Sequence, residues 1–271
     1  MPRRLLRAIV IALILLLALC FPFGPLFPWS PWKPGYTSVV FDRATIYYPA
    51  GGRLPGVFLD LDRDIEESEQ FHRLKVPKPI RVILCRNWSD FHRFMPGTGR
   101  VGAVTLDTGT VIYVAPRIAE RGLDYAEFLR HEISHATVNQ HQSLREAHAN
   151  SKAPWLFEGL AVSFGRQKAY ATLPEFKAFV MARDLVPVID PGKHRPDVPS
   201  DMRLNYQVWR YFLEYLTETQ GRDKFQKLLL EAIRDPASSE RVFQTVNGVS
   251  MPDEIRSFRA DILAGRCTAR P

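Results

Sequence analysis

The sequence is poor in cysteine and lacks the signs of a nucleic-acid-binding surface. Three cysteines in 271 residues are too few for a disulfide framework, and a chain of this length can bury a core without one. Cys20 falls in an apolar run, so Cys85 and Cys267 are either a disulfide pair or two separate thiols. The 36 Lys and Arg against 29 Asp and Glu give a net charge of +7, but the basic residues are scattered, without interleaved aromatics. We therefore expect no nucleic acid among the partners.

The clearest targeting signal is the N-terminal segment. A basic start is followed by the apolar run of residues 8–20, a pattern typical of membrane targeting. No small-x-small cleavage pattern follows, and Leu19 is too large for a bacterial lipoprotein box. These features favour an uncleaved signal anchor over residues 1–27, and the alternative is a protein secreted after signal cleavage. Because positive charge precedes the span, the rest of the chain should face the periplasmic side of the inner membrane.

The remainder of the chain divides into a linker and one domain. Residues 28–36 are rich in Pro and Trp and predict a stiff linker, and a domain over residues 37–271 should follow it. The pattern predicts strands first and helices afterwards, which indicates an α+β fold with a small mixed sheet and a mainly helical C-terminal half. No pattern indicates an oligomeric state. Strands are expected at 45–48, 80–85 and 110–114, and helices at 60–75, 89–94, 124–140, 154–166, 173–184, 203–220, 222–234, 238–247 and 252–264. The proline-rich loop between them, residues 186–202, is a surface connector or the rim of a cleft.

The chemistry is concentrated in the run His131-Glu132-Ile133-Ser134-His135, inside the predicted helix 124–140. Residues four apart on a helix lie one above the other, so both imidazoles can converge on one ion. Glu132 follows the first histidine and can reach a water beside that ion. A catalytic zinc site takes three protein ligands and keeps a fourth position for water. The motif therefore predicts Zn²⁺ held by His131 and His135, with Glu132 as the catalytic base.

Two residues compete to be the third ligand, His141 and Glu158. The spacing of His131, His135 and His141 fits the metzincin pattern, but Val138 occupies the position where that pattern has a glycine that ends the helix. Glu158 lies on the apolar side of a helix that Pro154 can begin, and a buried carboxylate there needs a partner. We expect Glu158. His148 and Glu146, in the polar connection, are weaker alternatives.

At this point the sequence resembles the gluzincin metallopeptidases, in particular the bacterial peptidase MA-like domains. These pair H-E-x-x-H with a downstream W-x-x-E-G-x-A helix, which Trp155, Glu158, Gly159 and Ala161 match. The resemblance covers roughly residues 78–264 and implies a zincin-like fold with Glu158 as the third zinc ligand. It also implies that residues 111–114 are the edge strand along which a peptide lies, and that Tyr206 stabilises the oxyanion.

These patterns together predict a membrane-anchored zinc metallopeptidase that acts on a peptide or protein substrate. The alternative is a catalytically inactive, zincin-like envelope module that keeps the zinc and serves in binding or assembly. The presence of Glu132 argues against that alternative, because a module without catalysis has no use for a base. A third reading, a globular domain with accidental histidines, predicts no bound metal.

Overall fold

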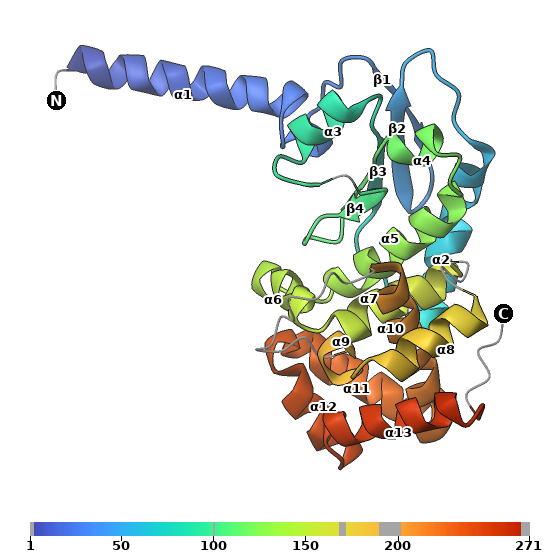
Figure 1. The fold of residues 1–271 in the computed structure, drawn as a ribbon. Coiled ribbons are helices and arrows are strands. Elements are labelled where there is room, and N and C mark those ends of the chain that lie inside the picture. The colour runs from blue at the N-terminus through green and yellow to red at the C-terminus, as the bar shows by residue number, and fades with distance from the viewer. Residues whose placement is uncertain (1–2, 100, 168–171, 190–201, 267–271) are drawn as a thin grey trace.

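The computed structural model describes residues 3–99, 101–167, 172–189 and 202–266. Its body has a sheet half, which carries helices on both faces, and a helical half formed by the C-terminal part of the chain (Figure 1). A single long helix, α1 (Arg3–Phe23), projects from the sheet half. The predicted α+β layout, with a small mixed sheet followed by a mainly helical half, is confirmed.

The sheet has five strands in the order β1-β2-β3-β5-β4. Both pairs that involve β3 are parallel, and the two outer pairs are antiparallel. Three strands are at the predicted places, β2 (Ala44–Pro49), β3 (Ile80–Leu84) and β5 (Val111–Val114), whereas β1 (Tyr36–Val40) and β4 (Ala103–Thr105) were not predicted. The interpretation of residues 111–114 as the edge strand is wrong, because β5 pairs with β3 on one side and β4 on the other. The edge on that side is β4.

Two core layers hold helices against the two faces of the sheet. Val82 of β3 packs with residues of α2 (Leu61–His72) and α5 (Tyr125–Asn139) on one face. Its neighbour Ile83 points to the other face and packs with α3 (Trp88–Phe94), as alternate side chains of a strand do. Arg130 of α5 also pairs with Asp64 of α2 at 2.6 Å. The helix that carries the histidine motif is therefore fixed on the sheet.

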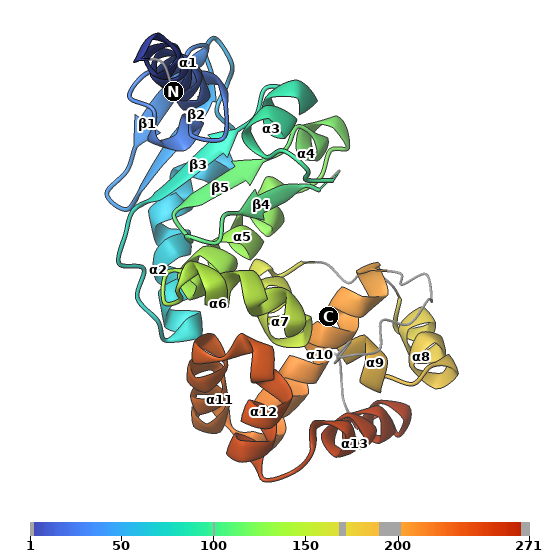
Figure 2. The same cartoon turned by 90° about the vertical axis from the view of Figure 1, so that its left-hand side faces the viewer.

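The helical half is built around α7 (Pro154–Gly165), which packs between α5 and α10 (Met202–Gln220). Figure 2 shows α10 running beside α7, with the last helices packed below it. Trp155 of α7 and Phe212 of α10 are fully buried there. The predicted helices are present, with ends within a few residues of the predicted ones. The remaining helices, predicted or not, are in chain order α4 (Arg117–Glu120), α6 (Leu144–Ala149), α8 (Leu173–Ala182), α9 (Val186–Ile189), α11 (Arg222–Arg234), α12 (Ser239–Asn247) and α13 (Met251–Leu263), with short 3₁₀ turns η1 (Phe27–Trp29), η2 (Gly56–Asp60), η3 (Asn150–Lys152) and η4 (Pro236–Ser238).

Helix α1 is long and apolar enough to cross a membrane, since Leu5–Phe23 has a mean hydropathy of 2.7 over its most apolar window. A signal sequence near the N-terminus would look the same. Where α1 meets the body, Phe27 of η1 is buried and stacks on Phe94, with ring centroids 4.3 Å apart. The Lys33 ammonium donates to the Phe27 carbonyl oxygen at 2.9 Å. The last residue of the predicted anchor therefore packs on the domain. The boundaries at residues 27 and 36 remain predictions.

Two sequence predictions fall partly on residues that the structure does not describe. Cys85 is buried and forms no disulfide with a described residue, but Cys267 lies outside the described part, so the pairing stays a prediction. The loop predicted over residues 186–202 begins with α9, and residues 190–201 are also outside the described part. Its role as the rim of a cleft stays a prediction as well.

Candidate metal centre

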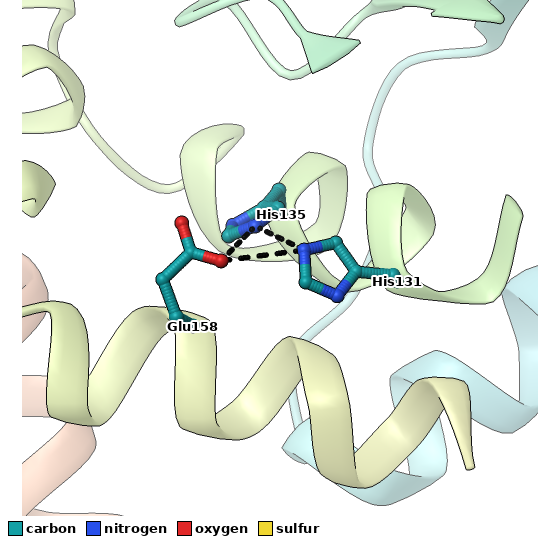
Figure 3. Close-up of side chains that lie close together, drawn as sticks. All are labelled: His131, His135 and Glu158. Carbon is teal, nitrogen blue, oxygen red and sulfur yellow. Dashed lines mark hydrogen bonds and ion pairs between the residues drawn. The ribbon is translucent and has the colours of Figure 1, made fainter. Parts of the chain in front are cut away.

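Helices α5 and α7 bring three side chains to one point, His131 and His135 from α5 and Glu158 from α7 (Figure 3). The two histidine Nε2 atoms are 3.1 Å apart. Glu158 Oε2 lies 3.3 Å from Nε2 of His131 and 3.5 Å from Nε2 of His135. The three residues predicted as ligands therefore lie together, although they come from two separate segments of the chain.

Local sequence features explain why the two helices meet here. The Asp124 carboxylate caps α5 by accepting from the backbone N–H of Ala126 at 2.8 Å. Pro154 occupies the first turn of α7, where a missing N–H costs nothing. Close approach depends on glycine. A Cβ added to Gly165 would stand 3.0 Å from the Glu127 carbonyl oxygen of α5, and one on Gly159 would stand 3.0 Å from the Trp209 carbonyl oxygen of α10.

The spacing of the three atoms suits a zinc ion. In a tetrahedral site with bonds of about 2.0 to 2.2 Å, ligand atoms are roughly 3.3 to 3.6 Å apart. The observed separations of 3.1, 3.3 and 3.5 Å are close to this. Two imidazoles and one carboxylate are also a donor set that zinc accepts. Among the described residues, this is the group of His, Cys, Asp or Glu side chains that could hold a metal ion.

The electrostatics of the cluster favour a positive charge. Burial alone would lower the pKa of His135, but the charge of Glu158, its hydrogen bond and the charge of Glu132 outweigh burial and raise that pKa to about 9. Burial alone would raise the pKa of Glu158, but the neighbouring His135 and His131 lower it well below its usual range. Without a metal, the cluster therefore holds a proton on His135 and a charge on Glu158. A cation can replace that proton.

A buried hydrogen-bond network joins α2 to α5. Burial lowers the pKa of His72 to about 4, so its imidazole is neutral. Its Nδ1 lies 2.8 Å from the Ser68 carbonyl oxygen and must be the protonated nitrogen, which leaves Nε2 to accept from the Ser134 hydroxyl at 2.8 Å. Ser68 also contacts Thr137 at 2.7 Å. In contrast, Nδ1 of His131 is buried without a hydrogen-bond partner among the described residues.

The three side chains open onto a pocket of about 410 Å³. Glu132 and Tyr206, the residues predicted as base and oxyanion stabiliser, both line it. The Tyr206 ring, from α10, has its centroid 6.1 Å from that of His131. One side of the pocket is formed by β4, where the Thr105 hydroxyl donates to Glu132 Oε2 at 2.7 Å. No local pattern points to Thr105, because its contact with Glu132 spans 27 positions of the chain.

The alternative ligands lie away from the cluster. Helix α5 continues through Val138 and ends at Asn139, so His141 lies beyond its end. His141 Nε2 donates to the Lys75 carbonyl oxygen at 2.6 Å and not to the cluster. His148 is at the pocket rim, with Nδ1 3.5 Å from a carboxylate oxygen of Asp107. Glu146 closes a capping box with Ser143 at the start of α6. The spacing Ser143-x-x-Glu146 was already a signal for that capping role.

No family model matches this sequence, and no curated protein matches it. Similar solved structures are zinc metallopeptidases. A mutant M1 zinc metallopeptidase from Deinococcus radiodurans is 15% identical, with 87% of this chain and 52% of that chain covered and a TM-score of 0.46. The non-mutant enzyme is 14% identical, with the same coverage and a TM-score of 0.44. A two-domain M1 zinc metallopeptidase mutant bound to L-tryptophan is 16% identical, with the same coverage and a TM-score of 0.48. This chain thus spans about half the length of these structures.

Proposed function

We propose that the chain is a zinc-dependent metallopeptidase of the gluzincin type, similar to the peptidase MA-like domains. The observation that carries this proposal is the triangle of His131 Nε2, His135 Nε2 and Glu158 Oε2, with separations of 3.1 to 3.5 Å. Glu132, whose carboxylate can accept a proton, lines the same pocket. Two histidines with only a structural role would not require the carboxylates of both Glu132 and Glu158 in the same pocket.

In this proposal His131, His135 and Glu158 hold the zinc. When bound, zinc supplies a Lewis acid that polarises the scissile carbonyl and makes a water acidic near neutral pH. Glu132 accepts the proton of the attacking water and then passes it to the leaving amine. The Tyr206 hydroxyl donates to the oxyanion that develops on the carbonyl.

The substrate is a peptide or protein segment bound in extended form along β4. Val101, Ala103 and Val104 line the pocket, and β4 is the strand at that edge of the sheet. An edge strand can pair with an extended peptide through main-chain hydrogen bonds. Such pairing would hold the scissile bond between Glu132 and the three ligands. This is the role that the sequence had suggested for residues 111–114.

Helix α1 is proposed to anchor the peptidase domain in the inner membrane as a single span. Its exposed apolar side chains and the basic residues Arg3 and Arg7 before the apolar run fit an anchor whose N-terminus stays in the cytoplasm. The domain would then work on the periplasmic side. Cleavage of the segment as a signal would instead give a secreted enzyme with the same pocket.

The proposal is tested with the full chain in detergent by measuring zinc content and peptide cleavage for matched variants. Glu132→Gln should keep zinc and lose cleavage by about 10²- to 10⁴-fold, because only the base is removed. Glu158→Gln should lose zinc, and His141→Ala should keep both properties. Cleavage retained in Glu132→Gln would disprove the mechanism. Full zinc occupancy of the wild type without turnover of a broad peptide library would favour the inactive envelope module.

A further inference from the structure

The carboxylate of Glu132 has one hydrogen-bond partner among the described residues, and that partner belongs to β4, which lines the same pocket. Thr105 Oγ1, on β4, lies 2.7 Å from Glu132 Oε2 and 2.9 Å from the backbone carbonyl oxygen of the same residue. A hydroxyl has a single hydrogen, so it donates to one of these atoms at a time. An ionised carboxylate is the stronger acceptor. The hydroxyl therefore holds Oε2 while Glu132 is charged.

This contact determines where the carboxylate lies. A glutamate side chain has several rotatable bonds, and fixing them costs conformational entropy. Glu132 is buried on the wall of the pocket, and the Thr105 hydroxyl holds its carboxylate there. With Oε2 held against β4, the other oxygen, Oε1, has no hydrogen-bond partner among the described residues and is left for a water or an amine.

Strand β4 is rigid enough to act as the support. Val104, beside Thr105, pairs with the fully buried Tyr113 of β5. Backbone hydrogen bonds flank the strand on both sides, from Leu106 to Val111 at 2.9 Å and from Ala115 to Gly102 at 2.9 Å. Threonine is also β-branched and has few χ1 rotamers. The direction of the hydroxyl is therefore set by the sheet.

We propose that Thr105 is a positioning residue that fixes the carboxylate of Glu132 for its work as the base. The inference rests on the proposed function and deepens it. In that function, β4 is also the strand along which the peptide lies. One strand then contacts both the peptide and the carboxylate of the base, and so helps to set the distance between them.

Kinetics of three variants of the full chain test this role. Thr105→Val keeps the shape but removes the hydroxyl, so zinc content and KM should stay within about twofold while kcat falls about 10- to 100-fold, the scale of a misplaced reacting group. Thr105→Ser should restore most of kcat. Thr110→Val is the matched control, because its hydroxyl bonds to Thr108 at 2.9 Å and not to Glu132. An unchanged kcat in Thr105→Val, or a loss of kcat that serine does not restore, would overturn the proposal.

A crystal structure of Thr105→Val with zinc tests the positioning without any turnover. We expect the Glu132 carboxylate to leave its place against β4 or to occupy several rotamers, and to return to one position in Thr105→Ser. A carboxylate that stays ordered at the same place in Thr105→Val would overturn the inference. If instead the wild type cleaves no peptide but the carboxylate moves as expected, the peptidase function is wrong and the positioning contact is right.

Discussion

At the scale of single residues, Glu158 gives the cluster a charge that a third histidine would not. Two neutral imidazoles and one carboxylate carry a net charge of −1, so a divalent ion leaves the site with +1 instead of +2. Glu158 lies between Phe157 and Leu160, which are buried, and its ionised form depends on the neighbouring histidines or on a cation. This explains why the carboxylate stands on an otherwise apolar helix. The same requirement makes Glu158 recognisable as a ligand from the sequence, since a carboxylate on the apolar side of a helix needs a partner.

Tyr206 offers a test of the second catalytic role. If its hydroxyl donates to the oxyanion, Tyr206→Phe should lower kcat about 10²- to 10³-fold, with little change in KM or zinc content, because the donor acts mainly in the transition state. Steady-state cleavage of a fluorogenic peptide measures this. Tyr48→Phe, on β2 and outside the pocket lining, is the control and should behave like the wild type. Equal kcat values for the two variants would assign Tyr206 a packing role.

At the scale of elements, the longer helices were predictable from local sequence, whereas the short helices α4, α6 and α9 and the order of the strands were not. Helix starts depend on local chemistry, and the caps at Asn87, Asp124 and Ser250 are present in the structure. Strand β4 has only three residues and is defined by its partner β5, a contact that no local pattern encodes. The run of residues 111–114 is apolar throughout, which is typical of a strand buried on both sides. That feature could have identified β5 as an interior strand.

The contact between α2 and α5 predicts a pH effect on stability. The folded protein keeps His72 neutral, with a pKa of about 4 against 6.5 for an ordinary histidine. Between those values the unfolded chain binds one more proton, so the free energy of unfolding falls as the pH falls from 6.5 towards 4. Each pH unit in this interval changes the free energy of unfolding by at most about 1.4 kcal/mol. Above pH 6.5 the contribution of neutral His72 is complete.

Urea unfolding of the metal-free chain at pH 7 and pH 4.5 measures this effect. The wild type should lose about 2 to 3 kcal/mol more than His72→Gln over that interval, because the variant has no imidazole to protonate. His72→Asn should give the same flatter dependence, whatever its own stability. A wild type and a pair of variants with parallel pH profiles would show that His72 does not titrate in this way.

At the scale of the whole molecule, the packing of η1 decides how the domain is held relative to a membrane. Helix α1 leaves the body from the sheet half, at the end opposite α11, α12 and α13 (Figure 1). Phe27, stacked on Phe94 and in contact with Tyr36, joins α1 to the body at that point. A free linker would leave the orientation of the domain open, whereas a packed η1 restricts it.

Phe27→Ala should therefore destabilise the domain and not only the anchor. Phe27 is 1% exposed, and removing a buried aromatic ring costs about 3 to 5 kcal/mol. Phe21→Ala is the matched control, because Phe21 lies on α1 and is 39% exposed. Thermal unfolding of both variants in detergent should give a lower Tm for Phe27→Ala alone. Equal Tm values would mean that η1 contributes nothing to the fold and that residues 28–36 are a free linker. A lower Tm for Phe27→Ala would show that the folded domain includes residue 27, and it would tie the direction of α1 to the sheet.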